Sequence, residues 1–342
     1  MDLGERKQKI LSAIIESYIR TGEPVGSKMV VDLLDNAVSS ATIRNEMAEL
    51  CSMGYLVQPH TSAGRLPTAP AFRLYVDKLM KRHALNEQSK REIDQMFKSN
   101  CNDPEHLIEE ASEALAQSTG FAAVTTTPCE QSACIIRLEV MRVTPRTAAL
   151  LIMTSSGALR SRVCRFDTEI SAEVIAKLSA SLSQSFVGKP FHSIGIAQVQ
   201  SQLVSLGEIG FMCAPVLTAF MELVQETSEA EVMLSGQLNL LQHPDYELER
   251  ARSLLSFLTS RELLTNMLNA HSGGLRVVLG NEMMRPELDG SSIILTNYAP
   301  ESNLGGRIGI IGPLRMDYAA AIPRLEYFAK VIGHILSDMM QD

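Results

Sequence analysis

The chain lacks the long apolar segments and the secretion signal that would place it in or beyond a membrane. No stretch of its 342 residues approaches the roughly 20 continuous apolar residues that span a bilayer. The first residues, Met1 to Lys7, are mostly polar and lead into a patterned helix rather than into the apolar core of a signal peptide. We therefore expect a cytoplasmic protein. A hydrophobic content of 45% over this length predicts two or three compact domains.

Cysteines spaced for metal binding are missing. No two of the six cysteines stand at the C-x-x-C spacing of a zinc site. The nearest pair, Cys129 and Cys134, has no histidine cluster beside it. We expect reduced thiols that serve as small hydrophobic side chains, with no bound metal and no cofactor.

Familiar catalytic patterns are missing too, so the sequence predicts no catalytic residue and no enzyme. It contains no Ser–His–Asp spacing, no H-E-x-x-H helix and no P-loop. Gly305, Gly306, Gly309 and Gly312 do not form a dinucleotide fingerprint, because they stand inside a strand-like run that ends at Pro313. Tight turns and close backbone packing are the better interpretation of these glycines.

A strong positive charge is also lacking, since the net charge is -8. The charge is unevenly distributed: residues 1–82 carry eleven Lys/Arg against nine Asp/Glu, whereas the remainder carries twenty against thirty. Any nucleic-acid binding by the first part must therefore depend on local placement of charge. The acidic remainder would repel a duplex and orient the first part toward it.

Residues 1–82 predict three helices followed by a hairpin. Apolar residues recur at helical spacing over 6–20, and Gly22 with the proline after it ends that helix. Ser27 is placed to cap a second short helix, and Ser39 or Ser40 to cap a third. A strand-like segment, a loop and a short return follow the third helix, which is the winged helix-turn-helix arrangement.

The third helix has one apolar and one polar side. Ile43, Met47 and Leu50 share a face at 100° per residue, and Asn45 points almost directly away from them. A carboxamide can pair with the N6 and N7 edge of adenine, so Asn45 is the candidate base-reading residue. The alternative is a polar side chain that is only solvated on an exposed helix face. Arg44 stands at the edge of the polar face, where a phosphate contact fits better than a guanine contact.

Further candidate DNA contacts lie at the start of this helix and on the wing. Ser39, Ser40 and Thr42 suit phosphate oxygens, although one of the serines could act as a cap alone. On the wing, Arg65 could enter a minor groove or grip phosphates, or form a salt bridge within the domain. His60 could contact DNA or order the loop.

The remainder of the chain predicts helices and strands around a sheet. Residues 79–120 are helical in pattern, and a closing helix is expected from Asp317, its cap, to Met340. Arg315 could pair with Asp317. The expected strands of this part are 121–126, 135–143, 148–154, 159–166, 275–280, 293–298 and 307–311. Its further expected helices are 172–186, 214–225 and 247–268.

Several motifs resemble those of the heat-inducible transcription repressor HrcA family. The resemblance covers essentially the whole chain, because its blocks form two groups in the right order, one near each end and some 250 residues apart. The blocks are Pro24-Val25-Gly26-Ser27, Ala41-Thr42-Ile43-Arg44-Asn45-Glu46-Met47-Ala48, Gly54-Tyr55-Leu56, Gln58-Pro59-His60-Thr61-Ser62-Ala63-Gly64-Arg65, Pro67-Thr68 and Gly309-Ile310-Ile311-Gly312-Pro313-Leu314-Arg315-Met316-Asp317-Tyr318.

The chain departs from the family pattern at three places. Ser40 stands where the family usually has Pro, and the turn near Asp35 and Ala37 lacks the usual Gly, so Asp35 or Asn36 would take any left-handed conformation. Residues 69–72 replace Asp-Lys-Gly-Tyr, which removes one candidate phosphate contact. We expect altered operator affinity with the same mode of binding.

The resemblance implies an α+β fold, with an N-terminal winged helix-turn-helix followed by a GAF-like sensor domain that carries an inserted dimerisation subdomain. The expected boundaries are 1–82 for the DNA-binding domain, 83–119 for a helical connector, 120–186 and 246–342 for the GAF-like domain, and 187–245 for the insertion.

The function implied is repression of heat-shock chaperone operons by a homodimer bound to an inverted-repeat (CIRCE-type) operator in double-stranded DNA. The chaperonin GroEL would support the active state, which is lost on heat shock. Two alternatives stay open: a winged-helix regulator whose sensor domain binds a small-molecule ligand, and an enzyme or nucleotide-binding protein whose helix-turn-helix makes only protein contacts.

Overall fold

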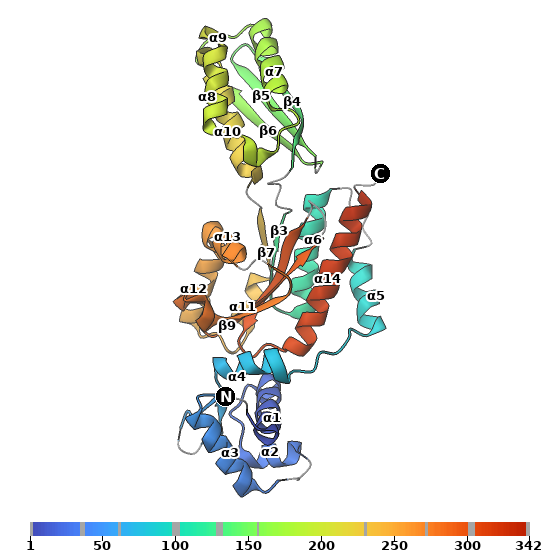
Figure 1. Ribbon diagram of the computed structural model, residues 1–342, viewed down its shortest axis with the longest axis vertical. Helices are drawn as coiled ribbons and strands as arrows, with labels where there is room; N and C mark the ends of the chain where they lie inside the picture. The colour runs from blue at the N-terminus through green and yellow to red at the C-terminus, as the bar shows by residue number, and fades with distance from the viewer. Residues whose placement is uncertain are drawn as a thin grey trace. The chain divides into compact units, whose positions relative to one another are not determined.

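The chain opens with three helices and a two-stranded hairpin (Figure 1). Helix α1 spans Glu5–Thr21, α2 Ser27–Leu33 and α3 Ser40–Ser52, and strand β1 (Leu56–Val57) pairs antiparallel with β2 (Leu66–Pro67). This confirms the predicted winged helix-turn-helix. The computed structural model describes residues 3–34, 38–60, 63–97, 103–127, 133–155, 157–228, 231–270, 273–299 and 305–339.

The core of this first domain comes from the predicted apolar stripes. The inner residues of α1 and α3 are fully or almost fully buried, because the two helices pack against each other and against α2 and the hairpin. Gly22 ends α1 in the left-handed conformation at φ 71°, as expected for a glycine C-cap. The buried residues are Ile10, Leu11, Ile14, Ile15, Ile43, Met47 and Leu50.

One predicted cap is wrong. Ser27 is the first residue inside α2, whereas Gly26 is the N-cap and provides no side-chain cap hydrogen bond. The Ser27 hydroxyl instead lies 3.3 Å from the Ser40 hydroxyl at the start of α3. Ser27 therefore joins two helices rather than capping one.

Four helical segments connect the hairpin to a central sheet. They are α4 (Ala69–Leu74), the π-helix η1 (Tyr75–Leu79), α5 (Glu87–Met96) and α6 (Pro104–Thr119). The sheet has five strands in the order β7-β3-β10-β9-β8, and β10 pairs antiparallel with β3 as β9 does with β8. The strands are β3 (Ala122–Thr126), β7 (Val232–Ser235), β8 (Arg276–Leu279), β9 (Ser291–Tyr298) and β10 (Gly306–Pro313).

Helices cover both faces of the central sheet (Figure 1). Helices α6 and α14 lie on one side, and α12 and α13 pack against the other through a shared apolar cluster that includes Leu254 and Phe257. We call this part of the structure, residues 103–125, 232–298 and 307–332, the sheet domain. Its remaining elements are α11 (Gln237–Gln242), α12 (Leu248–Thr259), α13 (Arg261–Ala270), η4 (Gly280–Met283), η5 (Pro286–Leu288) and α14 (Tyr318–Met339).

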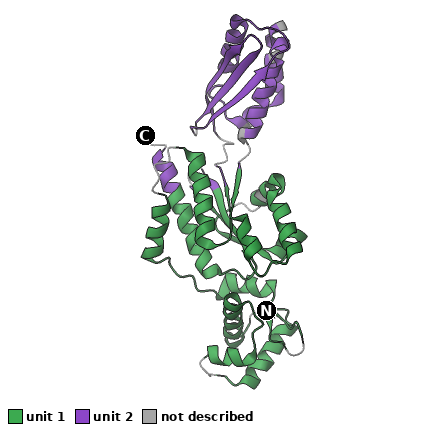
Figure 2. Ribbon diagram, turned by 180° about the vertical axis from the view of Figure 1, so that it is seen from behind, with its two compact units in different colours: residues 1–125, 232–298, 307–332 green, residues 126–231, 299–306, 333–342 purple. Residues whose placement is uncertain are grey.

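A second, separate sheet of three strands forms a unit of its own (Figure 2). Its strands, in the order β4-β5-β6, bury one face against α7 and α10. The elements are β4 (Ile135–Thr144), β5 (Thr147–Thr154), β6 (Leu159–Arg165), α7 (Ala172–Phe186), η3 (Phe191–Ser193), α8 (Ile196–Ser205), α9 (Glu208–Met212) and α10 (Ala214–Ser228).

The division of the chain differs from the expected boundaries. The first compact unit contains residues 1–125, 232–298 and 307–332, and the second contains 126–231 with two short later segments. The insertion thus begins about sixty residues before the expected 187–245, because β4, β5 and β6 build their own sheet instead of extending the central one. Its ends leave β3 and enter β7, which are neighbours in the central sheet.

No helix in the described part of the chain combines the length and the hydropathy that crossing a bilayer requires.

The predicted close packing is confirmed at Gly309 and Gly312 of β10. A Cβ on Gly309 would lie 2.4 Å from Leu295 Cδ2 and 2.7 Å from the Ile294 carbonyl oxygen, both on the neighbouring strand. A Cβ on Gly312 would lie 2.9 Å from the Phe121 ring. These two glycines let neighbouring backbone and side chains approach β10 closely.

Gly309→Ala should lower the free energy of unfolding by about 1–3 kcal/mol, because the added methyl overfills a packed sheet. Gly274→Ala is the matched control, since a Cβ there meets nothing within 4 Å; it should shift the value by less than about 0.5 kcal/mol. Urea denaturation followed by circular dichroism measures both. Equal stability of the two variants would contradict the packing argument.

Candidate nucleic-acid interface

The start of α3 is held by hydroxyl groups. Ser39 is the N-cap, and its Oγ accepts a hydrogen bond from the Thr42 backbone N–H at 3.2 Å while lying 2.9 Å from the Thr42 hydroxyl. Ser39, rather than Ser40, is therefore the cap. Ser40 is half-buried beside Ser27. Of the three predicted hydroxyl contacts, Ser39 alone is exposed, and Thr42 is half-buried.

Arg44 and Asn45 are both exposed on α3, with Asn45 opposite the buried residues and Arg44 at the edge of the polar face. Within the described part of the chain, neither side chain forms a hydrogen bond or an ion pair. A guanidinium and a carboxamide are thus presented side by side on a short helix whose other face is anchored. Their donors and acceptors are those that read base edges or bind phosphate oxygens.

Three ion pairs join α3 to α1. Lys7 Nζ lies 2.9 Å from Glu46 Oε2 and 2.9 Å from Glu49 Oε2, and Arg6 Nε lies 3.3 Å from Glu46 Oε1. Hydrogen bonds to Glu49 and then Glu46 raise the pKa of Lys7. The Glu46 side chain is only 12% exposed, so it positions α3 on α1 and does not face a ligand. Sequence reasoning missed this cluster, because no local pattern pairs residues so far apart.

The wing is built against the segment before α2. Val25 and Arg65 exchange two backbone hydrogen bonds of 2.9 Å, and a Cβ on Gly64 would lie 2.6 Å from the Val25 carbonyl. Glycine at 64 is thus required by close backbone approach. The Arg65 side chain is half-buried with Nη1 at 3.4 Å from the Ala63 carbonyl oxygen, and among the described residues it has no carboxylate partner.

His60 is exposed before the wing tip, and its carbonyl accepts the Ala63 N–H at 2.9 Å. Thr61 and Ser62, which belong to the wing motif, lie outside the described residues. So does the 35–37 turn, for which a left-handed conformation was expected. The structure therefore places Ser39, Ser40 and Thr42 at the start of α3, Arg44 and Asn45 on its exposed side, and His60 and Arg65 on the separate wing.

The first domain contacts the sheet domain through aromatic rings and two arginines. Phe72 is buried with its ring centroid 6.4 Å from that of Tyr18 and 6.2 Å from that of Tyr318. Arg73 on α4 bonds Glu282 at 2.8 Å and the Val277 carbonyl at 2.7 Å. The departure from the family pattern at residues 69–72 thus lies in a helix that docks on the sheet domain.

Arg315 reaches in the opposite direction, from the sheet domain to α1. Its Nε lies 2.8 and 2.6 Å from the two carboxylate oxygens of Asp245, and Nη1 donates to the Ile19 carbonyl at 3.1 Å. The suggested pairing of Arg315 with Asp317 is therefore wrong. Asp317 caps α14 as predicted, accepting the Ala320 N–H at 3.1 Å.

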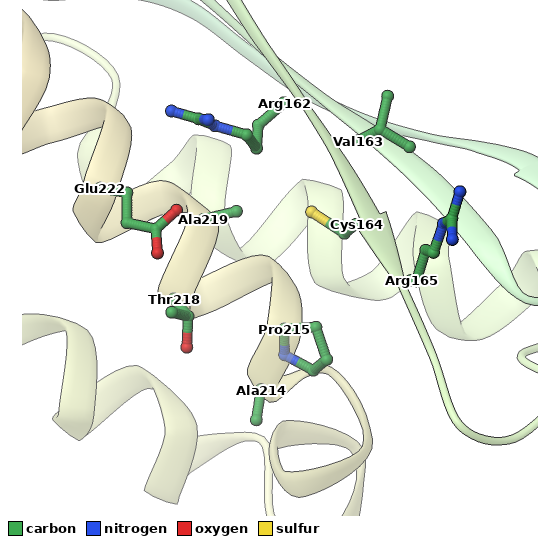
Figure 3. A pocket seen from close by; sticks show the side chains of 9 residues that line it. All are labelled: Arg162, Val163, Cys164, Arg165, Ala214, Pro215, Thr218, Ala219 and Glu222. Carbon is green, nitrogen blue, oxygen red and sulfur yellow. The ribbon is translucent and has the colours of Figure 1, made fainter.

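The second unit has an open groove of about 460 Å³ between β6 and α10 (Figure 3). Arg162 on β6 and Glu222 on α10 line its mouth, and Arg162 also forms an ion pair with Glu226. Cys164 is buried there, and burial raises the pKa of its thiol, as it does for Cys213. Both thiols fill core positions, as predicted for cysteines used as small hydrophobic side chains.

Comparison with known proteins identifies both halves of the chain. The family described as "Winged helix-turn-helix transcription repressor, HrcA DNA-binding" matches residues 2–79, and "HrcA protein C terminal domain" matches residues 105–322. A heat-inducible transcription repressor HrcA from Carboxydothermus hydrogenoformans is 32% identical over 98% of this chain and 99% of its own length. One from Acetivibrio thermocellus is 32% identical over 98% and 97%.

A similar fold occurs among solved structures. The crystal structure of a protein described as hypothetical superposes with a TM-score of 0.65 at 24% identity, covering 99% of this chain and 100% of that one. At this identity the likeness shows the fold alone.

Proposed function

This chain belongs to the heat-inducible transcription repressor HrcA family and is a winged-helix transcription repressor; we propose that it binds an inverted-repeat, CIRCE-type operator before chaperone operons as a homodimer and releases it on heat shock. The observation that carries the proposal is the exposed pair Arg44 and Asn45, which has no partner among the described residues and stands on a helix anchored through its other face. Repression of chromosomal genes would place the protein in the cytoplasm.

In the proposed complex, α3 lies in the major groove. Asn45 reads adenine through its carboxamide, and Arg44 contacts a backbone phosphate. Ser39 and the free amides at the start of α3 meet a second phosphate, where the helix dipole favours negative charge. The half-buried Ser40 and Thr42 support this end of the helix and contact DNA less directly.

The wing supplies the second contact. His60 and Arg65 flank its tip, and a basic residue there suits the phosphates beside a minor groove. The salt-bridge alternative for Arg65 has no support, since no carboxylate pairs with it among the described residues. Its Nη1 donates to the carbonyls of Ala63 and Gly64, which holds the guanidinium beside the wing loop.

The second unit offers a surface for dimerisation. The outer face of the β4-β5-β6 sheet is rich in apolar side chains, with Leu159 60% and Val163 65% exposed. Arg137 and Glu139, paired at 2.6 Å, add both charges to the same face. Such a face is self-complementary under a two-fold axis, because the arginine of one copy can meet the glutamate of the other. The remaining apolar members are Met141, Ala149, Leu151 and Met153.

The chaperonin GroEL is the proposed partner that sustains the active state. The name of the relatives, heat-inducible repressors, supports coupling to protein folding. Exposed apolar side chains on α8 and α9, among them Val204 and Phe211 at 75% and 73% exposure, are of the kind that chaperones bind. A small loss of active dimer would then lower operator occupancy, since occupancy follows the active fraction.

Footprinting on the cell's own chaperonin promoter tests the proposed function. The full-length protein should protect an inverted repeat, and added chaperonin should lower the concentration that gives half-maximal protection. Protection that required a small molecule instead would favour the ligand-sensing alternative. No specific protection at any promoter upstream of a chaperone gene would contradict the proposal.

Asn45→Ala should relax base preference at one operator position, with a loss of about 1–3 kcal/mol in discrimination, and should leave binding to unrelated DNA nearly unchanged. Arg65→Ala is the matched comparison: it should weaken binding to all sequences and reduce the salt-dependence slope by up to about one unit. Fluorescence anisotropy at several salt concentrations measures both. Equal losses on operator and unrelated DNA in Asn45→Ala would remove Asn45 from base reading.

Val163→Glu should convert the dimer to monomer at micromolar concentration, because it buries a charge within the proposed interface. Val204→Glu is the control, since Val204 is at least as exposed as Val163 but stands on helix α8 of the same unit. Sedimentation equilibrium measures the oligomeric state of each. If Val204→Glu dissociates the dimer and Val163→Glu does not, the interface lies on the helical side.

A further inference from the structure

Arg315 joins its own segment of the chain to two others. It stands in the loop between β10 and α14, its carboxylate partner Asp245 stands between α11 and α12, and its carbonyl partner Ile19 is in the last turn of α1. The guanidinium also lies on Gly22, where a Cβ would be 3.1 Å from Cζ and from Nη2. The Arg315 side chain is only 13% exposed.

The chemistry of this contact suits an arginine. A planar guanidinium can bind a carboxylate along one edge and a carbonyl along another, which a lysine ammonium on its flexible stem does less well. The last four carbonyls of a helix have no partner within the helix, and that end of the dipole favours a cation. The sheet domain therefore supplies the charge that completes the C-terminus of α1.

Fixing the end of α1 also fixes α3. The two helices share a buried core, and Lys7 joins them by ion pairs to Glu46 and Glu49. A rotation of α1 about its docking contact would therefore carry Asn45 and Arg44 with it. The direction in which α3 faces DNA thus depends on how α1 is held by the sheet domain.

We propose that Arg315, with Asp245, is a positioning residue for operator binding: it holds α1 so that the recognition helix takes one orientation relative to the sheet domain. This inference rests on the proposed binding of a dimer to an inverted repeat, in which the distance between two recognition helices selects the half-site spacing. Loosening the contact would leave each winged helix able to bind its half-site. It would remove the preference for one spacing.

The test measures affinity for operators whose spacer is lengthened by one or five base pairs. Five base pairs are about half a helical turn, so wild type should lose at least about tenfold in affinity. Arg315→Met should bind the unaltered operator several-fold more weakly and lose no more than about threefold on the lengthened one. Asp245→Asn should also reduce the loss of affinity on the lengthened operator relative to the unaltered one, but by less than Arg315→Met does.

Arg324→Met is the matched control. Arg324 donates at 3.1 Å to the carbonyl of Ser118, near the end of α6, so it makes the same kind of contact inside the sheet domain. Arg324→Met should lose affinity on the lengthened operator by the same factor as wild type. Thermal unfolding of the variants shows whether they are folded, and if Arg315→Met is not, Asp245→Asn carries the test.

The outcomes separate the two ideas. If wild type discriminates between spacers and both Arg315→Met and Asp245→Asn discriminate equally well, the positioning role is overturned while the repressor function stands. If wild type binds the operator with no spacing preference, the proposed dimeric mode fails, and the positioning role fails with it.

Discussion

The burial of one face of α1 is the constraint on which the rest of the first domain depends. Ile10, Leu11, Ile14 and Ile15 have no exposed surface, and they pack under the helix that presents Arg44 and Asn45. Fully burying each such side chain is worth about 1.5–3 kcal/mol, far more than an exposed ion pair. Apolar packing therefore holds α3 against α1, and the Lys7 ion pairs help to fix the angle between the two helices.

The placement of the insertion follows from the order of the central strands. Because β3 and β7 are neighbours, the chain can leave the sheet, build a second unit and return beside its point of departure. Thr127 and Glu231 join the two connecting segments by hydrogen bonds of 2.8 Å. The five-stranded sheet is thus complete without β4, β5 and β6, and the second unit can present its outer face to another molecule.

Local patterns predicted the local structure well. The run Ala172–Phe186 forms a helix with the predicted bounds, and Asp317 caps α14 as expected, because periodicity and capping act over a few residues. The same reasoning suggested only nearby Asp317 as a possible partner of Arg315, whereas its partner Asp245 is 70 positions away. It also merged two sheets into one, since strand patterns do not say which strands pair. The polar side of the third helix was predictable; the ion pairs and the docking arginine that hold it were not.

The contact between Gly22 and Arg315 restricts which substitutions this protein can accept during evolution. Its left-handed conformation at φ 71° already disfavours other residues, and the Arg315 guanidinium occupies the space where their Cβ would be. A substitution at position 22 would therefore strain the helix end and also displace an arginine nearly three hundred residues away. A lineage that replaces Gly22 should therefore also lose the Arg315 contact, whereas one that loses Arg315 still keeps the backbone reason for glycine at position 22. A comparison of related chains would then show this one-way dependence between the two positions, although no segment of sequence connects them.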